Sequence, residues 1–139
     1  MSAVADSQVR EAIFKTRIDV RWGDMDAFNH VNNAQYLRYL EEARIQWLSQ
    51  AGVSITGGTG PVLAASTLNY RQPIGWPNQL LAELFVNRIG NSSMTIGHRL
   101  LSSTEPAVLH CDGHVVIVWI DTATGKSVSL PEDLRRAVA

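Results

Sequence analysis

The chain has very little cysteine and no strong excess of either charge. Cys111 is the only cysteine in 139 residues, so no intrachain disulfide and no paired-cysteine metal or redox motif can form. Lysine and arginine form no run and the formal net charge is -1, which gives no basic surface for a nucleic acid. The sequence also lacks the ~20-residue apolar run of a membrane helix and the pattern of a secretory signal. We therefore expect a cytoplasmic protein that binds neither nucleic acid nor membrane.

What the sequence does contain is the composition of a folded domain. Hydrophobic residues make up 45% of the chain and charged residues 18%, proportions that distinguish globular chains from disordered ones. A length of 139 residues suits one domain with a sizeable core. We predict a single domain over residues 1–139, in which residues 1–12 are a loose N-terminus and residues 130–139 form a short C-terminal helix.

Two periodicities dominate the first third of the chain. Apolar and polar residues alternate from residue 14 to residue 22, which predicts a half-buried strand with Trp22 on its apolar face. From residue 34 to residue 51 apolar residues recur every three or four positions, which predicts a helix of about five turns. Gly52 is suited to end this helix in a left-handed conformation, and Asn32 or Asn33 can cap its start.

Four further apolar segments follow the helix, at about residues 62–74, 79–89, 94–101 and 107–120. Short turn-rich sequences separate them, which favours tight antiparallel connections over helical crossovers. The last segment contains six successive apolar residues, "VVIVWI", as is typical of a strand covered on both faces. The order of the elements predicts an α+β fold in which an antiparallel sheet accompanies one long helix.

Two segments outside these elements could hold a ligand, but we favour structural roles for both. The glycine-rich residues 56–61 lack the Lys-Ser/Thr pair of a phosphate-binding loop, so we predict a flexible connection. In "HCDGH", a strand would place His110, Asp112 and His114 on one face, where a metal is conceivable but ordinary surface residues are favoured. Cys111 would point the opposite way, as a small core thiol. We expect no metal and no cofactor.

The predicted helix carries a cluster of charged residues. Glu41 and Glu42 lie beside Arg38 and Arg44 at the spacings of helical salt bridges. Solvated ion pairs account for all four residues without a function. A buried Glu42 acting as a catalytic base is the minor alternative.

The stretch "RWGDMDAFNHVNN", residues 21–33, lies between the predicted strand and the predicted helix. A carboxylate such as Asp24 or Asp26, placed just before a helix, can lie near unpaired backbone N–H groups that carry partial positive charge. Such N–H groups can stabilise an oxyanion, while the carboxylate attacks a carbonyl or activates water. The segment therefore supplies the minimum equipment for hydrolysing an activated acyl group.

Three quoted segments carry a resemblance to a known family. "RWGDMDAFNHVNNAQYLRYLEEAR", "LNYRQPIGWPNQL" and "GHVVIVWIDTATGKSVSLPEDLR" resemble the hotdog-fold thioesterases of the 4-hydroxybenzoyl-CoA thioesterase-like type. The resemblance covers residues 13–134, and its most specific part is D-x-D-x-x-x-H-V-N-N leading into Y-L-x-Y-L-E-E-A. It implies a hotdog fold, in which an antiparallel sheet wraps around a long central helix, and a homodimer or homotetramer with acyl-thioester sites at the dimer interface.

The same resemblance implies roles for residues of this segment. The second aspartate of the block, Asp26, matches the family's catalytic carboxylate, and the backbone N–H of Asn33 matches its oxyanion donor. His30 joins these two as a catalytic candidate, whereas Asp24 is expected to hold the turn. The substrate-binding candidates are Asn32, Tyr36 and Phe28.

These observations favour an acyl-CoA thioesterase that acts through Asp26, and they leave two alternatives open. One is hydrolysis of an acyl group carried on acyl carrier protein, and the other is a hotdog dimer that binds an acyl thioester without turnover. Trp22, Phe28 and Tyr36 could line an acyl pocket, although ordinary core packing is the better expectation. Any of four basic residues could meet the phosphates of CoA, and no motif selects among them: Arg71, Arg88, Arg99 and Lys126.

Overall fold

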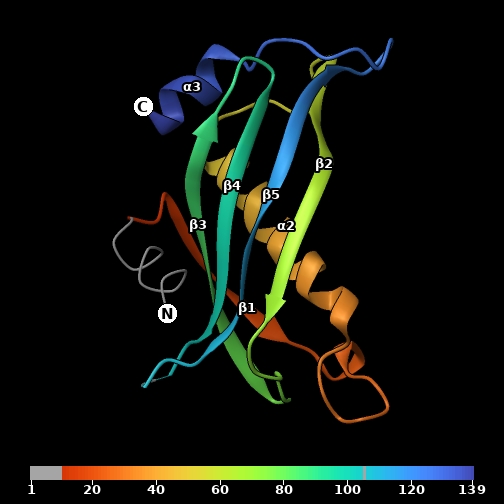
Figure 1. Cartoon of the computed structure of the whole chain (residues 1–139), viewed down its shortest axis with the longest axis vertical. Coiled ribbons are helices and arrows are strands. Elements are labelled where there is room, and N and C mark those ends of the chain that lie inside the picture. The colour runs from red at the N-terminus through yellow and green to blue at the C-terminus, as the bar shows by residue number, and fades with distance from the viewer. Residues whose placement is uncertain (1–10, 105) are drawn as a thin grey trace.

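A computed structural model describes residues 11–104 and 106–139, and five of its strands form one antiparallel sheet. The strand order across the sheet is β1-β3-β4-β5-β2 (Figure 1). The bounds of the strands are β1 Phe14–Val20, β2 Thr59–Tyr70, β3 Asn78–Ile89, β4 Ser93–Ser102 and β5 Leu109–Asp121. Residues 1–10 of the predicted loose N-terminus lie outside the described residues.

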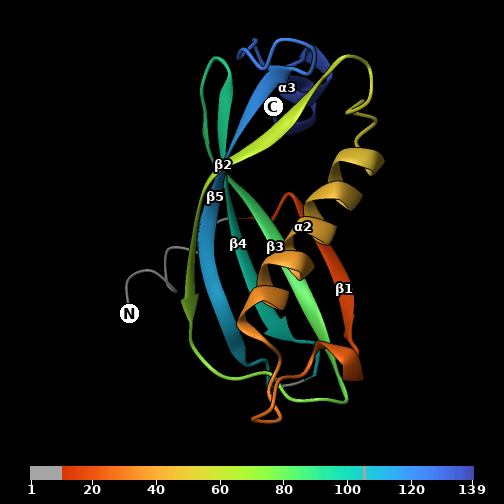
Figure 2. The same ribbon diagram turned by 90° about the vertical axis from the view of Figure 1, so that its right-hand side faces the viewer.

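The long helix α2, Asn33–Gln50, crosses one face of this sheet (Figure 2). The predicted apolar stripe is its buried side, and Tyr39 adds to it. This side packs on alternate residues of the strands beneath it, which are fully buried at positions such as Leu84, Leu100 and Trp119. The antiparallel α+β architecture predicted from the sequence is therefore confirmed.

Both ends of α2 show the chemistry that the sequence predicted. At its start, the backbone N–H of Ala34 donates a hydrogen bond of 2.9 Å to Oδ1 of Asn32, which satisfies one of the unpaired donors of the first turn. At its end, Gly52 has a φ of 75°, a left-handed conformation that side chains disfavour. The short C-terminal helix is α3, Glu132–Val138.

The prediction that Trp22 belongs to the buried face of the first strand is wrong. β1 ends at Val20, and Trp22 is 74% exposed in the single 3-10 turn η1, Trp22–Asp24. This turn closes because the backbone N–H of Arg21 donates to Oδ2 of Asp24 over 3.0 Å. A side chain that bonds nearby backbone groups can interrupt a strand in this way, and simple alternation cannot reveal it.

Two strands also differ from their predicted form. β2 begins at Thr59, within the glycine-rich segment predicted to be a loop, and ends at Tyr70, four residues before the predicted end. In β5 the "VVIVWI" residues alternate between buried and half-buried, so only one face of this strand is fully covered in the chain by itself. Residues 62–67 of β2, which forms an edge of the sheet, are all exposed as well.

Candidate active site

The loop between β1 and α2 is tied to the helix through Asp24. The Asp24 side chain is buried, with 9% of its surface exposed, and its Oδ2 accepts a hydrogen bond of 2.6 Å from the hydroxyl of Tyr39. The backbone N–H of Asn32 donates to the carbonyl oxygen of Asp24 over 2.9 Å, so the loop closes on itself at the same residue. Asp24 therefore holds the turn in place, in the position expected from the sequence.

Asp26 lies at the tip of this closed loop, inside a tight turn. Its Oδ1 accepts hydrogen bonds from the backbone N–H groups of Phe28, at 2.9 Å, and His30, at 3.3 Å. Its own N–H donates to the carbonyl of His30 over 2.7 Å, and Asn29 adopts a φ of 65° to complete the turn. Neither side-chain bond uses Oδ2 of Asp26, so the carboxylate is fixed in orientation while one oxygen stays available.

The start of α2 lies across a small cavity from this carboxylate. The cavity has a volume of about 320 Å³, and Asp26, His30 and Asn33 all contribute to its walls. Asn33 is the first residue of the helix, where backbone N–H groups have no intrahelical acceptor and carry partial positive charge. The structure thus brings the predicted carboxylate and the predicted oxyanion donor to one cavity.

The other predicted site residues divide into those that reach this cavity and one that does not. Phe28 lines it and is 82% exposed, whereas Tyr36 lines it from a nearly buried position, 3% exposed. Asn32 is absent from its described walls, and its side-chain oxygen already caps the helix at Ala34. The expectation that Asn32 binds substrate therefore conflicts with its use as a helix cap.

Sequence reasoning missed the opposite wall of the cavity, which comes from the end of β2 and the residues after it. Tyr70, Gln72 and Pro73 lie there. The Tyr70 ring packs edge-on against that of Tyr36 with centroids 4.9 Å apart, and its hydroxyl donates to the carbonyl of Asn33 over 3.3 Å. No local pattern marks these residues, because antiparallel strand pairing over a long sequence separation brings them to the helix.

Arg71 is the one member of the four candidate phosphate-binding residues found in the described walls of this cavity. Its guanidinium bonds both carboxylate oxygens of Asp112, at 3.0 and 3.3 Å, which fixes its position. The neighbouring His110 places Nδ1 3.1 Å from the carbonyl of Gln72. His110 and Asp112 therefore support the wall of the cavity. Both are buried, so the expectation that they are surface residues of the strand is wrong, whereas Cys111 between them is a fully buried core thiol, as predicted.

The titratable groups around the cavity leave Asp26 as its reactive candidate. Burial raises the pKa of the Tyr36 hydroxyl, and burial likewise raises that of Tyr70, so both phenols stay protonated at neutral pH. Asp26 is the only carboxylate among the described residues that line the cavity. A carboxylate, a helix start and two phenols around an open space can accommodate attack on an acyl carbonyl without a further acid.

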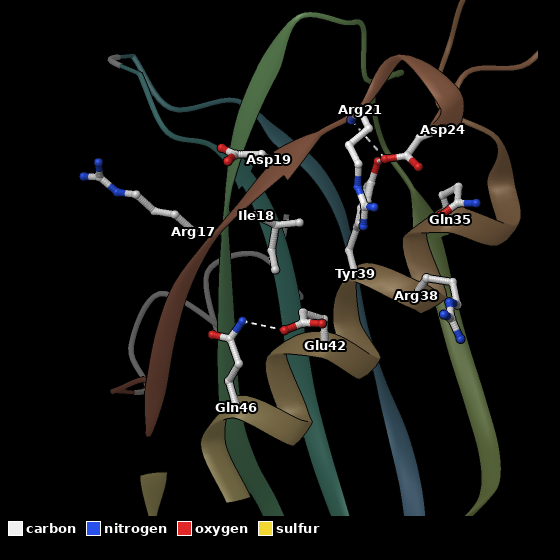
Figure 3. Close-up of a pocket in the computed structure, with 10 residues that line it drawn as sticks. All are labelled: Arg17, Ile18, Asp19, Arg21, Asp24, Gln35, Arg38, Tyr39, Glu42 and Gln46. Carbon is white, nitrogen blue, oxygen red and sulfur yellow. Dashed lines mark hydrogen bonds between the residues drawn. The ribbon is translucent and has the colours of Figure 1, made fainter. Parts of the chain in front are cut away.

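A larger cavity, of about 610 Å³, lies on the other side of α2, between that helix and β1 (Figure 3). Two pairs of its polar groups bond each other: Asp24 accepts from Tyr39 as described above, and Glu42 accepts a hydrogen bond of 2.7 Å from Gln46. Asp24 and Gln35 reach its walls, but neither Asp26 nor Asn33 is among the described residues that line it. Size alone therefore does not make it the active site.

Comparisons with known proteins identify the family of the chain. A family model described as the thioesterase-like superfamily matches residues 20–138, which include the Asp26 loop, α2 and every strand after β1. The chain belongs to the thioesterase-like superfamily. The sequence-based assignment to the hotdog thioesterases is confirmed at this level, while the narrower 4-hydroxybenzoyl-CoA thioesterase-like type remains a prediction.

Individual members of the superfamily resemble the chain over most of its length. The long-chain acyl-CoA thioesterase FadM of Escherichia coli is 28% identical over 130 residues, which cover 87% of this chain and 93% of FadM. A solved structure from Pseudomonas aeruginosa, provisionally assigned as a thioesterase, is 38% identical with a TM-score of 0.88, covering 93% of this chain and all of that one. A Xanthomonas campestris structure, provisionally assigned as an acyl-CoA thioesterase, is 55% identical with a TM-score of 0.73, covering 84% of this chain and 100% of its own.

Proposed function

We propose that this thioesterase-like protein hydrolyses acyl-CoA thioesters to the free acid and CoA, with Asp26 as the reacting carboxylate. The observation that carries the proposal is the single cavity shared by Asp26 and the first residue of α2, Asn33. The relative FadM is named a long-chain acyl-CoA thioesterase, and this name favours CoA esters over other thioesters as the substrate of this chain. The helix start and the carboxylate supply the two functions that hydrolysis of a thioester requires.

The thioester carbonyl would lie at the start of α2, where the Asn33 N–H stabilises the negative oxygen of the tetrahedral state. Asp26, held through Oδ1 by two backbone N–H groups, then acts in one of two ways through Oδ2. As a base it takes a proton from water, whose oxygen attacks the carbonyl carbon. As a nucleophile it forms an acyl anhydride that water then cleaves. In both routes the C–S bond breaks and the CoA thiolate leaves, so no separate acid is required.

The remaining predicted residues would position the substrate. His30 lies at the mouth of the cavity, and its backbone groups already bond Asp26, so its side chain is the part free to meet the pantetheine arm. Phe28, exposed beside it, offers an apolar surface to the same arm. The contacting rings of Tyr36 and Tyr70 would form a wall against which the first carbons of the acyl group pack.

We further propose that the protein acts as a homodimer or a larger homo-oligomer. β2 is an edge strand with unpaired backbone groups along its free side, and its exposed apolar residues include Val62, Leu63 and Tyr70. An edge of this kind is a template for pairing with another chain. Light scattering should report a mass above that of one chain, and Leu63→Lys should reduce it; a monomeric wild type contradicts the proposal.

Thiol release from a panel of acyl-CoA esters tests the activity and its catalytic residue together. The wild type should release CoA from at least one class of chain, and Asp26→Asn should not. Asp19→Asn is the matched control, because Asp19 is an exposed aspartate on β1 whose carboxylate accepts a bond from Gln79, outside the Asp26 cavity. The same acyl chain on CoA and on acyl carrier protein separates the two substrate classes.

Two results would overturn the proposal. Saturable binding of acyl-CoA with no thiol released from any chain would establish a binding protein instead of a hydrolase. Equal turnover by Asp26→Asn and the wild type would show that another group performs the reaction.

A further inference from the structure

A third cavity lies between α2 and β2, farther along both elements from the Asp26 cavity, and is mainly apolar. Its volume is about 120 Å³, and six of its lining residues are aliphatic: Ile45, Leu48, Val62, Leu63, Ile96 and Ile117. Helix α2 and strand β2 line this cavity, and the opposite ends of the same two elements line the Asp26 cavity. An acyl chain that starts at Asn33 and follows the seam would arrive here.

The length of α2 sets the distance of this third cavity from Asn33. Arg44, in its wall, is eleven residues beyond Asn33 in α2, and at 1.5 Å per residue this corresponds to about 16 Å along the helix axis. Only an extended chain of medium to long length can cover such a distance. The cavity therefore concerns the far end of the acyl group, away from the thioester.

Arg44 contributes a charged guanidinium to the wall of this mainly apolar cavity. Its Nη1 atom is buried and has no hydrogen-bond partner among residues 11–104 and 106–139, although the sequence suggested a solvated ion pair. Burial lowers the pKa of its guanidinium and the nearby Glu41 carboxylate opposes this effect, but an arginine keeps its proton in proteins. Glu41 also lines this cavity, and its carboxylate accepts a bond of 3.2 Å from Arg38. A buried charged donor without an acceptor is costly unless something satisfies it.

His98 lies in the same layer, beneath the helix. It is 2% exposed, and within the described residues no group meets its ring nitrogens at full hydrogen-bond geometry, although the Thr67 backbone interacts with the ring. It follows Ile96 by two residues in β4, so both side chains face α2, and the Arg44 charge acts on it. Burial, with Arg44 next, lowers the pKa of His98 to about 4, so the ring is neutral at pH 7 and offers one donor and one acceptor.

From these neighbouring groups we infer that the far end of the α2–β2 seam is a subsite for acyl chains that carry a carboxylate at their far end, with Arg44 as the residue that binds it. The inference rests on the proposed thioesterase function, because that function places the acyl chain in the seam. A terminal carboxylate would accept hydrogen bonds from Arg44 Nη1, and neutral His98 would support it from the sheet side. The aliphatic walls would hold the methylene groups before it.

Matched pairs of substrates test the subsite in the wild type. Dodecanoyl-CoA and its ω-carboxyl counterpart differ only at the far end of the chain. The wild type should have at least about tenfold higher kcat/KM for the ω-carboxyl ester, because a hydrogen bond to a charged partner typically contributes that much. An equal or lower value for the ω-carboxyl ester overturns the inference.

Substitution then assigns the preference to one residue. Arg44→Met retains the length of the side chain and removes its charge, and it should abolish the preference while leaving turnover of dodecanoyl-CoA within a few fold. Arg17→Met is the control, since Arg17 is an exposed arginine on β1 that lines the cavity on the other side of α2 and not the cavity of Arg44 (Figure 3). A preference that survives in Arg44→Met overturns the inference. Should this variant not fold, Arg44→Lys replaces it, with a reduced but measurable preference expected.

Binding of the free acids separates this inference from the proposed function. Calorimetry should show that dodecanedioic acid binds the wild type more tightly than dodecanoic acid, and that Arg44→Met removes the difference. If no ester is hydrolysed but the diacid binds in this way, the subsite is upheld and the proposed catalysis fails. If esters are hydrolysed and the two acids bind equally, the catalysis is upheld and the subsite fails.

Discussion

The buried, neutral His98 should make the stability of the fold depend on pH in a defined range. The unfolded histidine has a pKa of about 6.5, whereas burial and the Arg44 charge lower the folded value to about 4. His114 also lowers the folded pKa, and the Asp112 carboxylate and the Thr67 carbonyl partly oppose the shift. Between these two values the unfolded chain binds more protons, so stability falls as the pH falls.

The size of the effect follows from the difference between the two pKa values. A shift from 6.5 to about 4, at 1.36 kcal/mol per unit, corresponds to about 3 kcal/mol. This contribution is fully present above pH 6.5 and is lost progressively as the pH approaches the folded pKa. This free energy is a large part of the stability of an ordinary domain. Its loss should therefore be measurable even though the carboxylates titrate in the same pH range.

Denaturant unfolding isolates this contribution when the wild type is compared with His98→Leu. Both proteins are measured at the same protomer concentration and at several pH values from 7 to 4.5. The leucine variant cannot bind the proton, while every other group still titrates. The stability difference between the two proteins should therefore change by roughly 2 to 3 kcal/mol over this range, in favour of the variant at low pH. A difference that stays constant with pH would refute the buried, neutral state of His98.

Three other substitutions test separate parts of the structure. Tyr39→Phe removes the donor of the 2.6 Å bond to buried Asp24. It should lower the free energy of unfolding in denaturant by about 1.5–3 kcal/mol, and it should lower kcat/KM because the loop is held less firmly. A loss of unfolding free energy below about 0.5 kcal/mol argues against this anchoring role of Tyr39. Gly113→Ala would place a Cβ 2.0 Å from the Thr67 carbonyl oxygen at a φ of 148°, so thermal unfolding should show a loss above about 3 kcal/mol or no folded protein. Gly23→Ala, with no atom within 4 Å of the added Cβ, is its control and should change the melting temperature little. Asn32→Ala should cost about 1 kcal/mol in the same assay, because it removes the cap of α2; an unchanged stability would contradict that role.

Local periodicity was sufficient to predict the elements that carry the site. The three-to-four spacing of apolar residues located α2, and Gly52 and Asn32 located its ends, because helix termini depend on nearby chemistry. The position of Asp26 before the helix followed from the same information. These features are local in sequence, so one sequence can reveal them.

Features that depend on distant parts of the chain could not be predicted in this way. Tyr70 reaches Asn33 only through the pairing of β2 with β5 and the course of α2 across the sheet. Trp22 lies outside the strand because the Asp24 side chain accepts a hydrogen bond from the backbone of Arg21. The alternation of polar and apolar residues cannot predict such a bond. The sequence also could not show that the Asn32 side chain accepts a hydrogen bond from the Ala34 N–H, which competes with the predicted binding of substrate by Asn32.

Arg44 illustrates the same limit for charged residues. Its spacing from neighbouring glutamates suggested a solvated ion pair, which is the common outcome on a helix. The buried side of α2 is wide enough to cover its Nη1 atom, and the sheet places His98 beneath it. Burial of a charge is a property of the packed structure, so only coordinates could identify this pair.

The central claim is that Asp26 performs the reaction, and single-turnover hydrolysis of the best acyl-CoA substrate tests it most directly. With saturating enzyme, the rate constant of Asp26→Asn should fall by about 10²- to 10⁴-fold relative to the wild type, the usual contribution of a positioned acid or base. Both proteins should unfold at the same temperature, because the amide oxygen can still accept the bonds from Phe28 and His30. A variant that is folded and reacts at the wild-type rate would contradict the assignment of Asp26.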